Sequence, residues 1–217
     1  MVAQMTCATL APNQVPVLAP VAAPVAASPA EDFWLVGIDP GAKGALAALA
    51  AFSGQSHVLR MPMLDKAVAT LELRAWLAML TSKMPIRHAM IEKAQVMPRQ
   101  GAVSGFVYGR NYGALLTLLE LQEVPFSEIR PNQWREAILG RAPKKKVSED
   151  GETVRTSAQK KALKEISILT AKRMFPAATC GFRSLPDGVA EALLIAETAR
   201  RLVLCGNILG AKAQIHG

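Results

Sequence analysis

The chain has 217 residues, of which 51% are hydrophobic and 19% charged, as expected for a globular domain with one substantial core. Its net charge of +8 favours a polyanionic partner, either nucleic acid or an acidic membrane surface. No apolar run reaches the ~18 residues that a membrane span requires, and the three cysteines and three histidines lack disulfide or metal-ligand spacing. A reducing compartment is therefore expected, and any metal would have to be held by oxygen.

The N-terminal segment differs in composition from the rest of the chain. Residues 1–32 are rich in Ala, Pro and Val and contain no aromatic residue, which predicts a disordered arm. The segment has neither the basic start of a secretory signal nor the Arg/Ser bias of an organelle transit peptide. We therefore expect a folded domain at 33–204, with a frayed tail at 205–217.

A hairpin opens the predicted domain. The apolar run Phe33–Ile38 is typical of a buried strand. A Pro-Gly turn follows it, and Ala45–Phe52 is a second apolar run of strand length. Asp39 lies where the first strand ends, beside a buried sheet in which a bare charge is costly. Asp-Pro-Gly is also common turn chemistry, so Asp39 alone does not distinguish a turn residue from a site residue.

The next elements alternate between strands and helices. The predicted elements, in order, are a strand at 57–61, a helix through Leu71, Trp76, Leu77 and Leu80, a strand at 89–92, a Gly-rich loop at 96–113 entering a helix that continues through 115–121, a strand at 125–129, and a helix at 132–139 ended by Gly140. Glu92 stands at the C-terminal end of its strand. This order indicates an α/β fold with a mixed sheet.

The last third of the predicted domain is helical and basic. Residues 141–157 lack apolar periodicity and contain three consecutive lysines, which predicts a mobile basic loop. A helix is predicted at 158–175, and a final helix at about 184–204. Core positions are expected at Leu163, Ile166, Leu169, Thr170 and Met174 of the first helix, and at Trp134 and Phe175.

Two further carboxylates lie on the final helix. Asp187 and Glu191 are four residues apart and so project from one helix face, where like charges repel each other. Ser184 as N-cap with Asp187 three residues later would explain Asp187 as part of a capping box, but not Glu191. Glu92 taken alone is equally well explained as a solvent-facing edge-strand residue.

Taken together, the four carboxylates Asp39, Glu92, Asp187 and Glu191 predict a metal centre. Converging carboxylates destabilise one another unless a cation lies between them, and hard oxygen ligands suit Mg²⁺ or Mn²⁺. Two such ions about 3.5–4 Å apart are a recurring device for phosphodiester chemistry. A basic protein with an acidic, metal-loaded centre is what a nuclease requires.

Several motifs resemble those of one known family. They are Gly37-Ile38-Asp39-Pro40-Gly41 with Gly44-Ala45-Leu46, Ile91-Glu92-Lys93, Met97-Pro98-Arg99-Gln100-Gly101, the stretch 104–109 with Tyr112-Gly113, Arg130-Pro131-Asn132-Gln133-Trp134, Lys172-Arg173-Met174-Phe175-Pro176, and Asp187-Gly188-Val189-Ala190-Glu191-Ala192-Leu193-Leu194. In order and content they resemble the RuvC-type Holliday junction resolvases, in the branch of phages, bacteria and chloroplasts. The resemblance spans Trp34–Arg201 and implies an RNase H-like fold, with a mixed central sheet and helices on both faces.

The resemblance also implies an activity. It makes Asp39, Glu92, Asp187 and Glu191 the catalytic and metal-binding set for two Mg²⁺ ions, with Mn²⁺ as an alternative. The last position is often Asp in relatives, so Glu191 departs from the pattern. A homodimer acting on a four-way DNA junction in recombination and repair is implied, matching the two-fold symmetry of the junction. No membrane and no small-molecule cofactor is expected, and the location would be the cytoplasm and nucleoid or a chloroplast nucleoid.

DNA contacts are expected on two segments and one further arginine. The candidates are Lys93, Gln95, Met97, Arg99 and Gln100 after the second acidic strand, Arg110 on the next helix, and Lys160, Lys161 and Lys164 on the basic helix. Met97 is either a wedge between bases or a buried loop side chain. The three lysines either contact the DNA backbone or form a solvated helix face.

Two other classes of protein fit parts of the pattern. A module that binds DNA branches without cutting would share the basic charge, although it would not need four carboxylates. An actin-like phosphotransferase would share the Asp-x-Gly-x-x-Gly sequence after a strand, but the chain is too short for the second lobe of such enzymes.

Overall fold

A computed structural model describes residues 31–94, 101–140, 146–147, 153–154 and 156–206. The chain divides into Met1–Glu31 and Asp32–Gly217, and every element below belongs to the second unit. The predicted arm and tail, most of the 141–157 loop, and Gln95, Met97, Arg99 and Gln100 lie outside the described residues.

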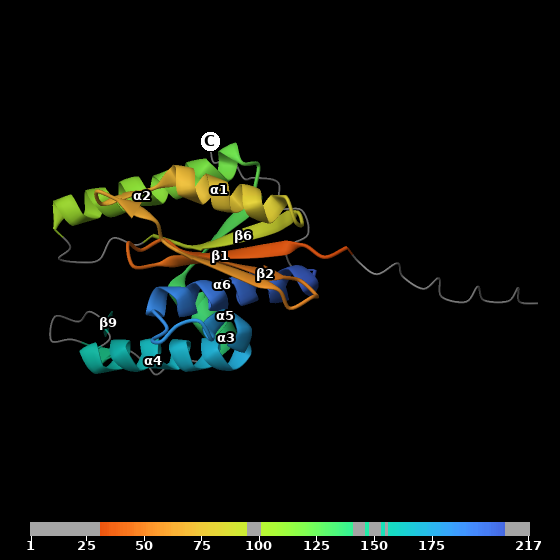
Figure 1. The fold of residues 1–217 in the computed structure, drawn as a ribbon. Helices are drawn as coiled ribbons and strands as arrows, with labels where there is room; N and C mark the ends of the chain where they lie inside the picture. Colours follow the sequence, from red (N-terminus) through yellow and green to blue (C-terminus); the bar gives the residue numbers. More distant parts are fainter. Residues whose placement is uncertain (1–30, 95–100, 141–145, 148–152, 155, 207–217) are drawn as a thin grey trace, which may run out of the picture. The chain divides into compact units, whose positions relative to one another are not determined.

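A five-stranded mixed sheet forms the centre of this unit (Figure 1). Its strands are β1 Trp34–Asp39, β2 Ala45–Ala50, β3 Ser56–Arg60, β6 Ile86–Glu92 and β7 Phe126–Ile129. They are ordered β3-β2-β1-β6-β7, with β1 antiparallel to β2 and parallel to β6. The apolar runs of the sequence form the three central strands, because a strand covered on both faces needs apolar residues at every position.

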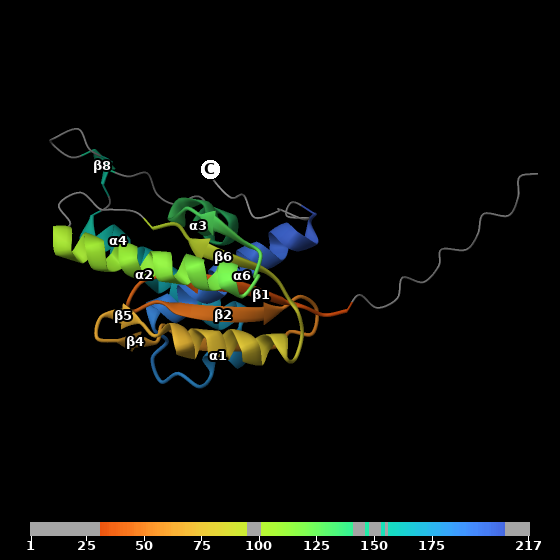
Figure 2. The ribbon, with the colours of Figure 1, turned by 90° about the horizontal axis from the view of Figure 1, so that it is seen from above.

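Helices cover both faces of the sheet (Figures 1 and 2). On one face lie α1 Thr70–Thr81 and α2 Ala102–Leu121. On the other face α6 Asp187–Leu204 packs directly against the sheet, with α3 Pro131–Leu139, α4 Ser157–Met174 and the short α5 Pro176–Thr179 around it. This α/β arrangement is an RNase H-like fold, as predicted.

Alternation along β1 separates two cores. Trp34, Val36 and Ile38 pack with α1 and α2, and Leu35 packs with α6. The Trp34 indole also donates a hydrogen bond of 3.1 Å to the Leu80 carbonyl of α1. Because successive side chains of a strand point to opposite faces, Asp39 lies on the α6 side of the sheet.

Two short ribbons complete the described elements. β4 Met63–Leu64 pairs with β5 Ala67–Val68, and β8 Lys146–Val147 pairs with β9 Thr153–Val154. The second ribbon falls within the stretch predicted as a loop. α4 begins just after Thr156, whose hydroxyl accepts a hydrogen bond from the Gln159 backbone in a capping box.

The predicted core face of α4 is wrong at two positions. Ile166 and Leu169 are 45% and 67% exposed, whereas Ser167 and Ala171 are fully buried. Small side chains let α4 approach its neighbours closely, so the buried stripe follows them and the larger apolar residues point outward. Leu163, Thr170 and Met174 are half-buried.

The predicted N-cap of the last helix is also wrong. Pro186, not Ser184, is the N-cap of α6, and no side chain caps it. Asp187 is the first helical residue and not the third residue of a capping box. Of the two predicted aromatic core residues, Trp134 is fully buried, and Phe175 is half-buried against the core on the α6 side.

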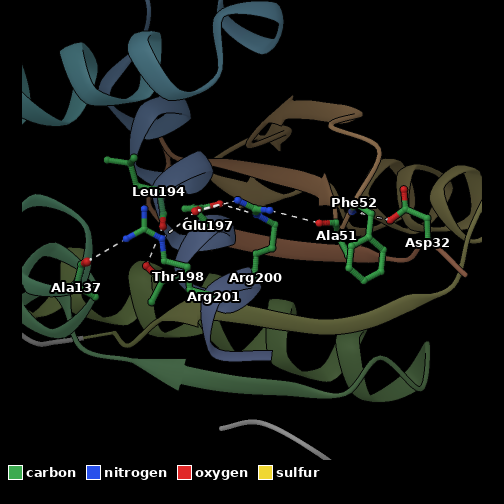
Figure 3. A network of polar contacts seen from close by, with 9 residues as sticks. All are labelled: Asp32, Ala51, Phe52, Ala137, Leu194, Glu197, Thr198, Arg200 and Arg201. Carbon is green, nitrogen blue, oxygen red and sulfur yellow. Dashed lines mark hydrogen bonds and ion pairs between the residues drawn. The ribbon is translucent and has the colours of Figure 1, made fainter. Parts of the chain in front are cut away.

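A buried ion cluster fixes the C-terminal half of α6 (Figure 3). Glu197 is 2% exposed and accepts hydrogen bonds from Arg200 at 2.7 and 3.1 Å and from Arg201 at 2.8 Å. The same arginines donate to the carbonyl of Ala51 after β2 and to that of Ala137 in α3. The buried carboxylate is thus fully compensated, which lets it tie α6 to its neighbours.

None of the helices in the described part of the chain is both long and apolar enough to cross a membrane.

Candidate functional site

Asp39 and Glu92 end two adjacent parallel strands. The register of β1 and β6 pairs Ile38 with Ile91, so the next residue on each strand is a carboxylate at the same edge of the sheet. Both side chains are half-buried. The turn after Asp39 is tight, because a Cβ on Gly44 would lie 2.1 Å from the Asp39 carbonyl oxygen.

Two glycines bring α6 onto this edge. A Cβ on Gly37 would lie 2.2 Å from the Ala196 nitrogen of α6, so the helix rests directly on the backbone of β1. A Cβ on Gly188 would lie 2.3 Å from the Lys43 carbonyl oxygen, so the start of α6 touches the hairpin turn. This close approach carries Asp187 and Glu191, on the first turns of α6, to the end of β1.

The pKa of Asp39 reflects its burial and the nearness of the other three carboxylates. Burial is the largest reason that the pKa of Asp39 rises to about 7, and the carboxylates of Glu191, Glu92 and Asp187 raise it further. A hydrogen bond of 3.2 Å from the Gly41 backbone opposes the rise only in part. The three other carboxylates predicted from the sequence therefore all lie within electrostatic range of Asp39.

Glu92 and Glu191 share a cationic partner on α3. An Nη atom of Arg135 lies 3.0 Å from a carboxylate oxygen of Glu191 and 3.9 Å from one of Glu92. The Trp134 indole N–H donates to Glu92 at 2.6 Å, and its ring lies 4.5 Å below the Arg135 guanidinium. Burial raises the pKa of Glu92, while the Trp134 hydrogen bond and the Arg135 charge lower it.

Asp187 has a different cationic partner. Lys164 of α4 forms a hydrogen-bonded ion pair with Asp187. This pair lowers the pKa of Asp187 and raises the pKa of Lys164. Lys164 therefore belongs to the acidic site as well as to the basic helix.

The donor set suits a divalent cation by its chemistry. All four predicted ligands are carboxylates, and after burial the negative charges of Glu191, Glu92 and Asp187 raise the pKa of Asp39. Among the described residues, no three His, Cys, Asp or Glu side chains are close enough together to form a metal-ligand cluster. The residues fit such an ion provided that the two basic side chains give way to it.

The other DNA-binding candidates among the described residues are Lys93, Arg110, Lys160 and Lys161. Lys93 forms an ion pair of 2.8 Å with Glu128 of β7. Arg110 donates to the Lys66 carbonyl at 3.2 Å. Lys160 and Lys161 are exposed on α4, where Lys161 lies 4.0 Å from Glu165.

Sequence reasoning missed three residues near the carboxylates. Trp134 was expected only as a core residue, and neither Arg135 nor Tyr108 was singled out. Burial, followed by the charges of Glu92 and Asp39, raises the pKa of Tyr108 to about 12. The Pro131 helix start after a strand was the available signal for α3, but no sequence spacing connects α3 with Glu92.

The fold and this edge define a class: an RNase H-like domain with a carboxylate cluster where its central parallel strands end. No protein-family model and no curated protein sequence matches the chain. One similar solved structure is Thermus thermophilus RuvC in complex with Holliday junction substrate, at 19% identity and a TM-score of 0.52, covering 80% of this chain and 96% of that one. Another is a Thermus thermophilus RuvC structure, at 20% identity and a TM-score of 0.49, covering 80% and 97%. The first of these two likenesses shows that the fold is RuvC-like.

Proposed function

We propose that this protein is a metal-dependent endonuclease that resolves four-way DNA junctions. The observation that carries the proposal is that Glu92, Asp187 and Glu191 all lie within electrostatic range of Asp39 at one edge of an RNase H-like sheet. The net charge of +8 around so acidic a site suits a phosphodiester substrate. The structural neighbour described in complex with a Holliday junction supports the choice of branched DNA.

In this proposal the four carboxylates hold two divalent ions, Mg²⁺ or alternatively Mn²⁺. Such a pair, when bound, supplies an activated water and neutralises charge on the leaving oxygen. The hydrogen bond from the Trp134 indole N–H fixes the orientation of the Glu92 carboxylate. The Gly41 N–H does the same for Asp39 from within the hairpin turn.

Basic residues near this edge would bind the DNA backbone. Lys93 follows Glu92 directly and is steered by its ion pair with Glu128. Lys160 and Lys161 stand on the same helix as Lys164, which reaches Asp187. Arg110 and the segment with Gln95, Met97, Arg99 and Gln100 complete the proposed contacts.

A junction has two strands to cut, so the proposal includes a homodimer. Val103 and Phe106 on the first turns of α2 are 79% and 72% exposed. A second copy that covers them would remove a costly apolar surface and place two sites symmetrically. We place the protein in the phage, bacterial and chloroplast branch of resolvases, acting in recombination and repair in a nucleoid.

A nicking assay on four-way, three-way and linear DNA tests the function. With Mg²⁺ the four-way junction should be cut in two strands, whereas linear DNA of the same sequence should stay intact, and EDTA should stop the reaction. Tight junction binding without cutting in either Mg²⁺ or Mn²⁺ would instead support a non-cleaving branch-binding module. Equal cutting of linear DNA would reject the junction specificity.

A further inference from the structure

We infer that Arg135 is a built-in counter-cation that holds Glu92 and Glu191 in the metal-free protein and competes with the divalent ion for them. The inference rests on the proposed function, because it concerns the same carboxylates. It assigns a role to a residue that the sequence did not single out.

The position of the guanidinium is that of a cation between two ligands. The same Nη atom of Arg135 lies 3.0 Å from Glu191 and 3.9 Å from Glu92. The three side chains are only 16%, 13% and 16% exposed, so water screens their charges weakly. Without Arg135, Glu191 would lose its hydrogen-bonded partner on α3, and the Glu92 carboxylate would keep only the Trp134 hydrogen bond against its burial and the charge of Glu191.

The hydrogen bonds of Arg135 are too few to fix it permanently beside Glu92 and Glu191. Its Nε atom is buried and has no hydrogen-bond acceptor among the described residues. The Glu92 contact is too long for a hydrogen bond, and the same Glu92 oxygen already accepts a hydrogen bond from the Trp134 indole. A guanidinium in a purely structural ion pair would be expected to have its buried donors satisfied.

The Glu197 cluster supplies the contrast within the same protein. There, Arg200 reaches both oxygens of the buried carboxylate at 2.7 and 3.1 Å and also donates to the Ala51 carbonyl. Glu197 is thus fixed from several sides, whereas Glu191 is held by Arg135 through one hydrogen bond of 3.0 Å. The contacts of Arg200 with Glu197 are those of a permanent structural ion pair, whereas the Arg135–Glu191 contact can be exchanged for a metal ion.

Competition between Arg135 and a metal ion for the same carboxylates predicts the direction in which the metal affinity changes when Arg135 is removed. An ion that binds Glu92 and Glu191 must displace the Arg135 guanidinium, so part of its binding free energy is spent on breaking that contact. Removing the guanidinium should therefore tighten metal binding and at the same time destabilise the metal-free protein. A residue that merely orders the ligands would have the opposite effect on affinity.

Calorimetric titration with Mn²⁺ tests the inference on the full chain. Arg135→Gln should bind Mn²⁺ about 5- to 150-fold more tightly than the wild type, the usual range of coupling between two ligands. In EDTA its melting temperature should be lower than that of the wild type, and Mn²⁺ should raise it by more. Arg135→Lys, which keeps the charge, should stay closer to the wild type in both measurements.

Arg200→Gln is the matched control. It removes an arginine from the Glu197 cluster, so it should lower the melting temperature and leave the Mn²⁺ affinity unchanged. Unchanged or weaker Mn²⁺ binding by Arg135→Gln, with a saturable wild type, would overturn the inference and leave the proposed function standing. If the wild type binds no Mn²⁺, the proposed metal centre fails as well. If Arg135→Gln does not fold even with Mn²⁺, Arg135→Lys decides: an Mn²⁺ affinity equal to that of the wild type or higher supports competition, and weaker binding overturns the inference.

Discussion

Asp39 shows at the scale of one residue how the site conflicts with stability. Its folded-state pKa of about 7 lies above the ordinary value of 3.8, so the folded chain binds more protons than the unfolded chain between these values. The ionised carboxylate is therefore a destabilising group at pH 8 when no metal is bound. A side chain kept at such a cost is better explained by chemistry than by turn formation.

Replacing Asp39 with Asn separates the effect of the carboxylate on stability from its proposed role in cutting DNA. In EDTA at pH 8, Asp39→Asn should be more stable than the wild type, by up to about 4 kcal/mol, because the buried charge is gone. The gain should shrink as the pH falls toward 4, where Asp39 is protonated in the folded wild type. Urea unfolding at pH 5 and pH 8 measures both values. The same variant should bind a four-way junction and fail to cut it, so preserved cutting would remove Asp39 from the proposed machinery.

His88, which lies away from the site, makes a second pH-dependent contribution to the free energy of unfolding. It is 3% exposed with a ring nitrogen 2.9 Å from the Ser127 hydroxyl, and burial lowers its pKa to about 4. Because the unfolded chain takes up a proton near pH 6.5 and the folded chain does not, this contribution is complete above pH 6.5 and is lost as the pH falls toward 4.

The His88→Gln variant tests that contribution. Between pH 7 and pH 4.5 the wild type should lose up to about 3 kcal/mol of stability through His88, and His88→Gln should lose less over the same range. Urea midpoints of the two proteins at both pH values give the comparison. Parallel losses in the two proteins would show that His88 is not responsible.

At the scale of elements, the packing of α6 on β1 depends on Gly37. A methyl group there would meet the backbone of α6 at Ala196, which cannot move aside as a flexible side chain can. Gly37→Ala should therefore lower the free energy of unfolding by about 1–3 kcal/mol or more and weaken metal binding, since α6 carries two of the four carboxylates. Gly181→Ala is the control, because a Cβ there meets nothing within 4 Å. Equal stability of the two variants would contradict this account of the helix–strand contact.

The sequence predicted these elements unequally. The strands of the hairpin and the strand ending at Glu92 were predicted correctly because continuous apolar runs and a Pro-Gly turn leave few alternatives. The buried face of α4 was mispredicted at Ile166 and Leu169, because hydrophobicity alone does not reveal that small residues set the closest helix packing. The start of α6 was mispredicted because Ser184 is a good N-cap by type, yet Pro186 occupies the position.

The site was predictable in its acidic members and not in its basic ones. Carboxylates at strand ends and at helical spacing are visible in a sequence, because each position follows from the periodicity of its own element. The contacts of Trp134 with Glu92 and of Arg135 with Glu191 join residues 42 and 56 positions apart. They depend on how α3 packs against the end of β6 and against α6, which no local pattern encodes.

At the scale of the whole molecule, we expect the exposed face of α2 to form the interface of the proposed homodimer. Phe106→Asp places a charge on a side chain that is 72% exposed in the single chain, so it should leave the fold intact and make the protein monomeric. Sedimentation velocity measures the mass, and circular dichroism checks the fold. The monomer should also lose paired cutting of the two junction strands. A dimeric Phe106→Asp protein would move the interface elsewhere.

The central claim is that four carboxylates distant in sequence form one divalent-cation site. Anomalous scattering from crystals grown with Mn²⁺ tests it most directly, because the ions themselves are located. We predict two peaks bounded by Asp39, Glu92, Asp187 and Glu191, with the Arg135 guanidinium moved off Glu191. Mn²⁺-bearing crystals with no peak beside Asp39 would contradict the account.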